Sequence, residues 1–176
     1  MTKPCSKIMI IRHAEKPDKH AIQGVTEAGT ADKDDLTVRG WQRVGALVRL
    51  FNPVPPAGLR PGLAVPSAIF VGPPTEQHSS KRPLHTVLPL AADLGLQVRT
   101  DFALHQEADL IAAALNAAAT VLICWHHERI PKLAAALGVV LEDWPDEVFD
   151  RVIVLDHAGP TWTLARVSQH LLPGDA

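Results

Sequence analysis

Two short, almost continuous apolar runs most constrain the fold that this chain can adopt. Residues 7–11 read KIMII and residues 120–125 read TVLICW. A strand that is buried on both faces, as inside a parallel sheet, lacks the alternation of apolar and polar residues seen in a half-exposed strand. Both runs therefore predict strands of a parallel sheet, and residues 68–71 (AIFV) predict another.

Segments between these runs show the spacing and the end signals of helices. Apolar residues recur at helical spacing after Thr37, the expected N-cap of the first helix. The second helix is expected to start at Arg82 with Pro83 in its first turn, to kink at Pro89 and to end at Gly95. The four predicted helices span residues 37–51, 82–95, 107–117 and 130–137.

Strands that alternate with helices indicate an α/β fold. Residues 96–98 predict one more short strand, and residues 151–156 and 161–167 predict a terminal hairpin around a Gly-Pro turn. We therefore predict a three-layer sandwich whose central sheet is mostly parallel, with an antiparallel edge strand. A chain of 176 residues has the size of one domain, so residues 1–176 are expected to form a single domain.

The charge and cysteine counts exclude several classes of protein. There are 17 Lys and Arg against 19 Asp and Glu, a net charge of −2, whereas a general nucleic-acid binder needs a basic surface. Two cysteines are too few for a disulfide framework. Residues 1–9 lack the features of a signal peptide, and no apolar run approaches the roughly 20 residues of a membrane span. We expect a cytoplasmic protein with no nucleic-acid or membrane partner.

Three polar clusters fall where the predicted strands end or a predicted helix begins. Arg12-His13 follows the first apolar run, His126-His127 follows the second, and residues 79–82 (SSKR) open the second helix. Ligands of open α/β sheets bind outside the carboxyl ends of the strands. Guanidinium groups match phosphate oxygens and a helix N-terminus adds N–H donors, so the three clusters together favour a phosphoryl group.

Each cluster also has an ordinary interpretation as solvated surface charge, and it is their common position in the fold that favours chemistry. The neutral imidazole of His13 can attack phosphorus, and the phosphohistidine that forms is labile to water. Metal binding is not expected, because the chain contains neither an HExxH nor a CxxC spacing. We therefore predict no metal and no cofactor.

Five segments, in order along nearly the whole chain, carry a pattern known from one family. They are residues 10–17 (IIRHAEKP), 35–43 (DLTVRGWQR), 80–86 (SKRPLHT), 121–127 (VLICWHH) and 144–152 (WPDEVFDRV). The chain resembles the histidine phosphatase superfamily, also called the phosphoglycerate mutase-like superfamily. Within it, the match is to the short single-domain bacterial type.

The resemblance implies a role for each matching residue. His13 would be the nucleophile that is transiently phosphorylated. Arg12 and Arg82 would bind the phosphoryl oxygens, and a second histidine would complete the pocket and stabilise the transferring group. The family's reaction uses no metal, so the resemblance also implies metal-independent phosphoryl transfer.

Two histidines compete for the role of the second one. The common family pattern is a glycine followed by one histidine, whereas here Trp125 is followed by both His126 and His127. The spacing from the preceding strand to residues 130–131 favours His126. Similarity to short members that keep only the later histidine favours His127, and we adopt His127. We predict that only one of the two faces the two arginines.

A leaving alkoxide or phenolate needs a proton donor. The family often places a carboxylate near the start of the third predicted helix, so the resemblance implies Glu107, with Asp109 as the reserve. Both also fit an ordinary acidic residue favoured by the helix dipole. Glu15, Lys16 and Ser80 adjoin the pocket residues, and we expect them either to touch substrate or to lie solvated in loops.

The predicted function is a metal-independent phosphatase that hydrolyses a phosphomonoester or a phosphoprotein through phosphohistidine on His13. Two alternatives use the same site. One is a phosphoryl mutase, for which this short chain lacks the insertions that enclose a sugar phosphate. The other is a module that binds a phosphate without turnover. The loops at 18–36, 52–66 and 72–79 carry no ligand motif, so the substrate and the oligomeric state are not predicted.

Overall fold

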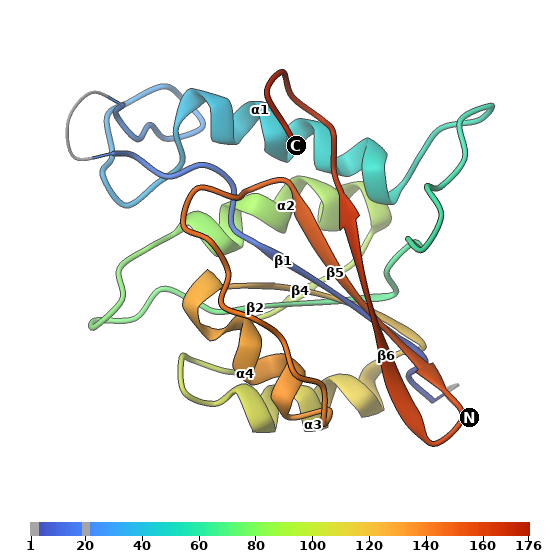
Figure 1. Cartoon of the computed structure of the whole chain (residues 1–176). Coiled ribbons are helices and arrows are strands. Elements are labelled where there is room, and N and C mark those ends of the chain that lie inside the picture. The colour runs from blue at the N-terminus through green and yellow to red at the C-terminus, as the bar shows by residue number, and fades with distance from the viewer. Residues whose placement is uncertain (1–3, 19–21) are drawn as a thin grey trace.

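The computed structural model describes residues 4–18 and 22–176. One six-stranded sheet runs through these residues, with helices on both faces (Figure 1). The strands are β1 (Lys7–Arg12), β2 (Ala68–Val71), β3 (Val98–Arg99), β4 (Thr120–Trp125), β5 (Arg151–Ala158) and β6 (Thr161–Ser168). The helices are α1 (Val38–Phe51), α2 (Arg82–Leu94), α3 (Glu107–Ala117) and α4 (Ile130–Ala135), with a 3-10 turn η1 (His127–Arg129) before α4.

The strands follow the order β3-β2-β4-β1-β5-β6. The first four are mutually parallel, whereas β5 is antiparallel to β1 and to β6. Figure 1 shows α1 and α2 over one face of this sheet and α3 and α4 over the other. The predicted α/β sandwich with a mostly parallel sheet and an antiparallel edge is confirmed.

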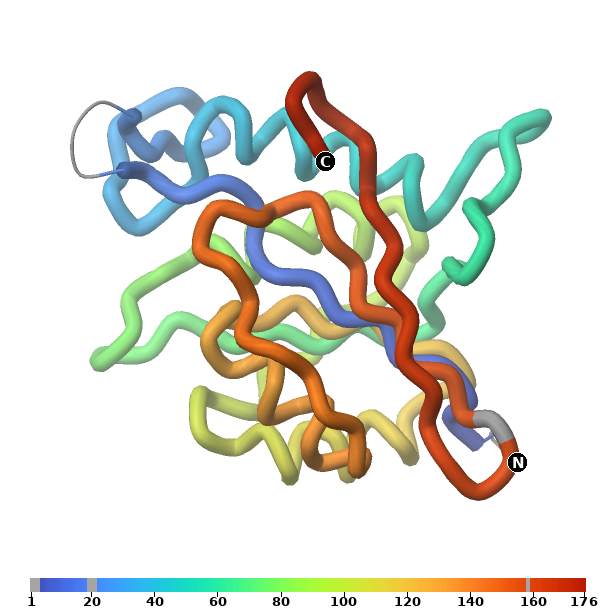
Figure 2. The backbone as a smooth tube through the Cα atoms, in the orientation of Figure 1, coloured from blue at the N-terminus to red at the C-terminus, as the bar shows by residue number. Residues whose placement is uncertain are grey.

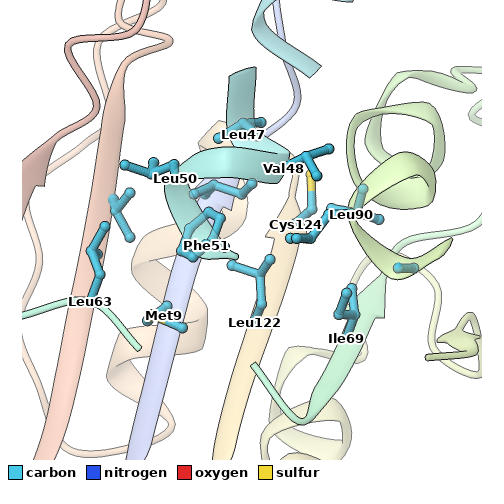
Figure 3. Close-up of a cluster of buried hydrophobic side chains, with 14 of the residues drawn as sticks. Met9, Leu47, Val48, Leu50, Phe51, Leu63, Ile69, Leu90, Leu122 and Cys124 are labelled. Atoms are coloured by element: carbon cyan, nitrogen blue, oxygen red, sulfur yellow. The ribbon is translucent and has the colours of Figure 1, made fainter. Parts of the chain in front are cut away.

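Both faces of the central strands are buried, as the apolar runs predicted. Met9 and Leu122 point toward α1 and α2, where Phe51 and Leu90 pack against them (Figure 3). The residues that alternate with them, including Ile10 and others of β1 and β4, join the second core beneath α3 and α4. Two separate hydrophobic layers therefore hold the sheet, and the strand ends are left to carry polar groups.

Capping residues set the ends of the helices. The Thr37 side chain accepts a hydrogen bond from the Gly40 backbone N–H at 3.0 Å, as expected of the N-cap of α1. Gly95 ends α2 in the left-handed region at φ 66°, and α2 continues through Pro89 to Leu94. The last predicted helix begins at Ile130 as expected but ends at Ala135, two residues early, because residues 136–138 form a turn.

The loops that follow β1, β2 and β4 gather on one side of the molecule, at the left of Figures 1 and 2. The described residues contain no helix that is both long and apolar enough to cross a bilayer.

Candidate active site

The register of the sheet brings the two strand-end clusters together. β1 and β4 are parallel neighbours, with Arg12 opposite Trp125. The next residues, His13 and His126, therefore leave the sheet at the same edge. Their ring centroids lie 6.3 Å apart in an edge-to-face arrangement, so segments more than 100 residues apart in sequence meet at one site.

The first turn of α2 is tied to the loop that follows His13. The Thr86 hydroxyl accepts a hydrogen bond from the Ala14 backbone N–H at 2.9 Å and donates to the Arg82 carbonyl at 2.7 Å. The Arg82 side chain also donates to the Lys33 carbonyl at 3.3 Å. One hydroxyl thus holds the second arginine beside the first polar cluster.

Arg12 is a buried cation with two unused donors. Its side chain is 1% exposed, and its Nη1 donates to the Asp146 and Val148 carbonyls at 2.6 and 3.2 Å. The guanidinium carbon lies 3.9 Å from the centre of the Phe149 ring. Burial lowers the pKa of Arg12 to about 10, against the opposing charge of Asp146. Its Nε and Nη2 have no hydrogen-bond partner.

Unsatisfied donors are concentrated around this arginine. Among the described residues, five buried side-chain atoms lack a partner; two belong to Arg12, one is Arg82 Nε and one is Ser80 Oγ. Burying a polar group without a partner costs free energy, so such a cluster needs an explanation. The fifth atom is Asp35 Oδ2, an acceptor, whereas the other four can donate hydrogen bonds to an oxyanion.

His13 is held as a neutral imidazole with one free nitrogen. Its Nδ1 lies 2.7 Å from the Ala14 carbonyl oxygen, which can only accept a hydrogen bond, so Nδ1 carries the proton. Burial lowers the pKa of His13 well below its usual range, and the neighbouring Arg12 lowers it further. The Nε2 lone pair is therefore available for attack at neutral pH.

The two histidines after β4 diverge. His126 packs against His13 on one side and His78 on the other, with the His78 ring centroid at 6.2 Å. Burial lowers the pKa of His126, and the positive charge of Arg82 adds to the shift.

His127 turns toward a different partner, because its Nε2 lies 3.1 Å from Asp146 Oδ1. Burial lowers the pKa of His127, and Arg12 lowers it further. We predicted that only one of the two faces the two arginines; the positive charge that lowers the pKa of His126 comes from Arg82, and the one that lowers the pKa of His127 comes from Arg12. The ring that packs against His13 belongs to His126, and not to His127, which we favoured from the sequence.

Glu107 does not have the properties of the proton donor that we predicted. Its carboxylate accepts hydrogen bonds from Arg129 at 2.7 and 2.9 Å, from Trp125 Nε1 at 3.2 Å and from the His105 backbone N–H at 3.2 Å. Burial raises its pKa, but these donors outweigh burial and lower it to about 2. At neutral pH Glu107 has no proton to donate, and the reserve, Asp109, is exposed on α3.

We expect Glu107→Gln to lower the free energy of unfolding by about 2 kcal/mol, because it removes charge-assisted hydrogen bonds from a buried acceptor. The relative rates of hydrolysis of aryl phosphates with good and poor leaving groups should not change. Urea unfolding and kcat/KM for both substrates measure the two effects. A loss confined to the poor leaving group would restore Glu107 as the acid.

Sequence reasoning missed a buried ion network beneath the loop after His13. Glu15, expected to touch substrate or lie in solvent, is 8% exposed and accepts hydrogen bonds from Arg43 at 2.8 to 3.1 Å. Arg43 also binds Asp175 at 2.7 and 3.0 Å. No short sequence pattern indicates this network, because its three members come from segments that are far apart in the chain. Lys16 pairs with Asp146 at 2.7 Å.

A half-open cavity of about 280 Å³ lies next to His126. His78, His105 and His126 line it together with Thr75, Gln77 and Leu104. The described residues that line it include no carboxylate, lysine or arginine. It lies beside His126, whose ring packs against His13. No group of three or more metal-ligating side chains was found among the described residues.

Comparison with known proteins identifies the fold. No protein-family model and no curated protein sequence matches the chain. The product of the open reading frame Rv3214 from Mycobacterium tuberculosis is 15% identical, with a TM-score of 0.55 over 93% of this chain and 97% of that one. The protein histidine phosphatase SixA, solved with tungstate, is 16% identical, with a TM-score of 0.53 and the same coverage. The chain therefore has the fold of the histidine phosphatase superfamily, as the resemblance implied.

Proposed function

We propose that this chain is a metal-independent phosphatase that forms a phosphohistidine on His13. The observation that carries the proposal is a neutral, buried His13 beside the buried Arg12 and the partly buried Arg82, whose guanidinium groups keep unused N–H donors. An ordinary structural arginine would satisfy these donors within the protein. Here they are left for a tetrahedral oxyanion.

In the proposed mechanism, the phosphoryl oxygens accept hydrogen bonds from Arg12 Nε and Nη2 and from Arg82 Nε. The His13 Nε2 lone pair attacks phosphorus, so a P–N bond forms as the P–O bond to the leaving group breaks. Water then attacks phosphorus, breaks the P–N bond and releases inorganic phosphate. Positioning and charge stabilisation by fixed cations supply most of the catalysis.

The likeness to SixA supports this proposal in two ways. SixA is a protein histidine phosphatase of the same fold, and its complex with tungstate shows that such a fold binds a tetrahedral oxyanion. The half-open cavity beside His126 leaves room for either a small phosphomonoester or a phosphorylated protein side chain. Both substrate classes therefore belong to the proposal.

The test is to mix the protein with 4-nitrophenyl phosphate, quench it within milliseconds and map phosphate on the chain by mass spectrometry. Phosphate on His13, with a burst of 4-nitrophenol, is the expected result. Tight phosphate binding without turnover would show the binding module instead. With a sugar phosphate as the substrate, transfer of the phosphoryl group to a second position of the sugar, without release of inorganic phosphate, would show a phosphoryl mutase. Undiminished hydrolysis in the presence of a chelator is expected as well.

Substitution of each histidine after β4 separates their roles. We expect His126→Ala to lower kcat by about a hundredfold, because His126 packs against the nucleophile and borders Arg82. His127→Ala is expected to cost less than about tenfold, since its Nε2 is engaged by Asp146. The measurement is kcat on 4-nitrophenyl phosphate. Equal, mild losses would contradict the assignment, and a larger loss at His127 would reverse it.

A further inference from the structure

The side chain that protonates the leaving group remains to be identified, because Glu107 is ion-paired. In the proposed reaction the bond between phosphorus and the leaving oxygen breaks, and an alkoxide leaves only if an acid delivers a proton to it. The titratable side chains that line the cavity beside the nucleophile are His78, His105 and His126. The proton donor is expected among these three imidazoles.

His126 is the least suited of the three to donate a proton. It packs against His13, next to the phosphoryl-binding arginines, where burial and neighbouring positive charges favour its neutral form. His78 lies on the exposed loop after β2, on the same wall as His126. His105 lies on the loop that enters α3 and also lines the cavity.

The backbone at His105 is built in an unusual way. Its φ is 75°, in the left-handed region that residues other than Gly adopt uncommonly, although Asn, Asp and His are enriched there. The turn around it is closed by Gln106, which donates its N–H to the Ala103 carbonyl at 3.2 Å and accepts from the Ala103 N–H through Oε1 at 2.8 Å. Glycine would adopt this backbone conformation without steric strain, so a histidine at this position costs free energy of folding.

Glu107 explains how this strained conformation is maintained. Its Oε1 accepts the His105 backbone N–H at 3.2 Å, and the same carboxylate is fixed by Arg129 and Trp125. Strained residues persist where the surrounding contacts over-determine them, and they concentrate at functional sites. Glu107 thus holds the backbone of His105 through a hydrogen bond that the amide oxygen of a glutamine can also accept, so Glu107→Gln is still expected to leave the ratio of the two rates unchanged.

We propose that His105 is the proton donor to the leaving group, an inference that rests on the proposed phosphatase activity. As His13 Nε2 bonds to phosphorus and the P–O bond breaks, the His105 imidazolium transfers its proton to the departing oxygen. The neutral His105 then accepts a proton from the water that attacks the phosphohistidine. Each turnover returns His105 to its protonated state and releases an alcohol or phenol and inorganic phosphate.

His105→Asn tests this role, because asparagine tolerates the left-handed backbone but cannot act as an acid. We expect kcat/KM for phenyl phosphate to fall about a hundredfold or more, and kcat/KM for 4-nitrophenyl phosphate, whose leaving group needs no proton, to fall less than about threefold. His78→Asn, in the same cavity, is the matched control and should lower kcat/KM for both substrates by the same factor. His105→Gly, which removes the backbone strain, should behave like His105→Asn.

Two outcomes would overturn the assignment: equal losses for both substrates in His105→Asn, or a selective loss for phenyl phosphate in His78→Asn instead. Either result would leave the phosphatase proposal intact if the wild-type protein hydrolyses 4-nitrophenyl phosphate and carries phosphate on His13. If the wild-type protein does neither, the phosphatase proposal fails, and the assignment of His105 fails with it.

Discussion

His13→Gln is expected to abolish phosphatase activity, with a fall in kcat of about 10⁴-fold or more, as in other enzymes that lose a covalent nucleophile. Glutamine can donate its amide N–H to the Ala14 carbonyl, as His13 Nδ1 does at 2.7 Å, but it has no lone pair on nitrogen with which to attack phosphorus. The measurement is kcat on 4-nitrophenyl phosphate, with mass spectrometry of the quenched protein to show that no phosphohistidine forms.

The control for this variant is retained oxyanion binding. Arg12 and Arg82 keep their unused donors in His13→Gln, so tungstate should still raise its melting temperature, as it should for the wild-type protein. Loss of activity together with normal tungstate binding separates the chemical step from a damaged pocket. Activity within about tenfold of wild type would show that His13 is not the nucleophile.

Arg43→Ala is expected to have the largest effect on stability, a loss of about 3–5 kcal/mol in the free energy of unfolding. Arg43 is 2% exposed and donates to both oxygens of Glu15, both oxygens of Asp175 and the side chain of Gln169. Burial lowers the pKa of Arg43, but its hydrogen bonds to Asp175 and Glu15 outweigh burial and raise it. Removal of the cation would leave two carboxylates near each other without their main partner.

Arg39→Ala is the matched control, because Arg39 contacts the same two carboxylates but its side chain is 43% exposed. Exposed ion pairs contribute little, so we expect a loss below about 1 kcal/mol. Urea unfolding of both variants measures the difference. Equal losses would show that the network is solvated and does not brace the loop.

The network also bears on the active site. Glu15 lies two residues after His13, and its carbonyl accepts the Thr37 backbone N–H at 3.0 Å. A Cβ at Gly40, in the first turn of α1, would lie 2.7 Å from that carbonyl oxygen. The loop after the nucleophile is therefore packed between α1 and the ion network. We infer that Arg43 supports the position of His13 from a distance.

The strands and most of the helices could be predicted from local pattern. Two apolar runs can be buried only as central strands, and Thr37 and Gly95 mark helix ends through hydrogen bonds and backbone angles that depend on near neighbours. The positions of the three site residues could then be predicted as well, because Arg12 and His13 lie at the end of a strand and Arg82 lies at the start of a helix. The last helix was predicted two residues too long, because the chain leaves the helix in a turn at residues 136–138.

The partners of the site residues could not be predicted in the same way. Glu107 was taken as an acid because its place in the chain allowed it, but Arg129, 22 residues later, holds it as an ion pair. His126 and His127 are adjacent in sequence, but His126 packs against His13 and His78, whereas His127 Nε2 lies 3.1 Å from Asp146 Oδ1. No spacing rule distinguishes two such side chains.

The sequence by itself determined the order of strands and helices and the presence of a histidine at a strand end with two arginines near it. The strands and helices follow from the pattern of apolar residues, and the helix ends follow from capping residues close by in the chain. Both kinds of signal can be read from the sequence. Only the tertiary structure decided which buried groups are paired and which are unsatisfied. Pairing is set by distances between segments far apart in the chain: Arg129 keeps the carboxylate of Glu107 ionised, whereas Arg12 keeps two N–H donors without a hydrogen-bond partner in the protein.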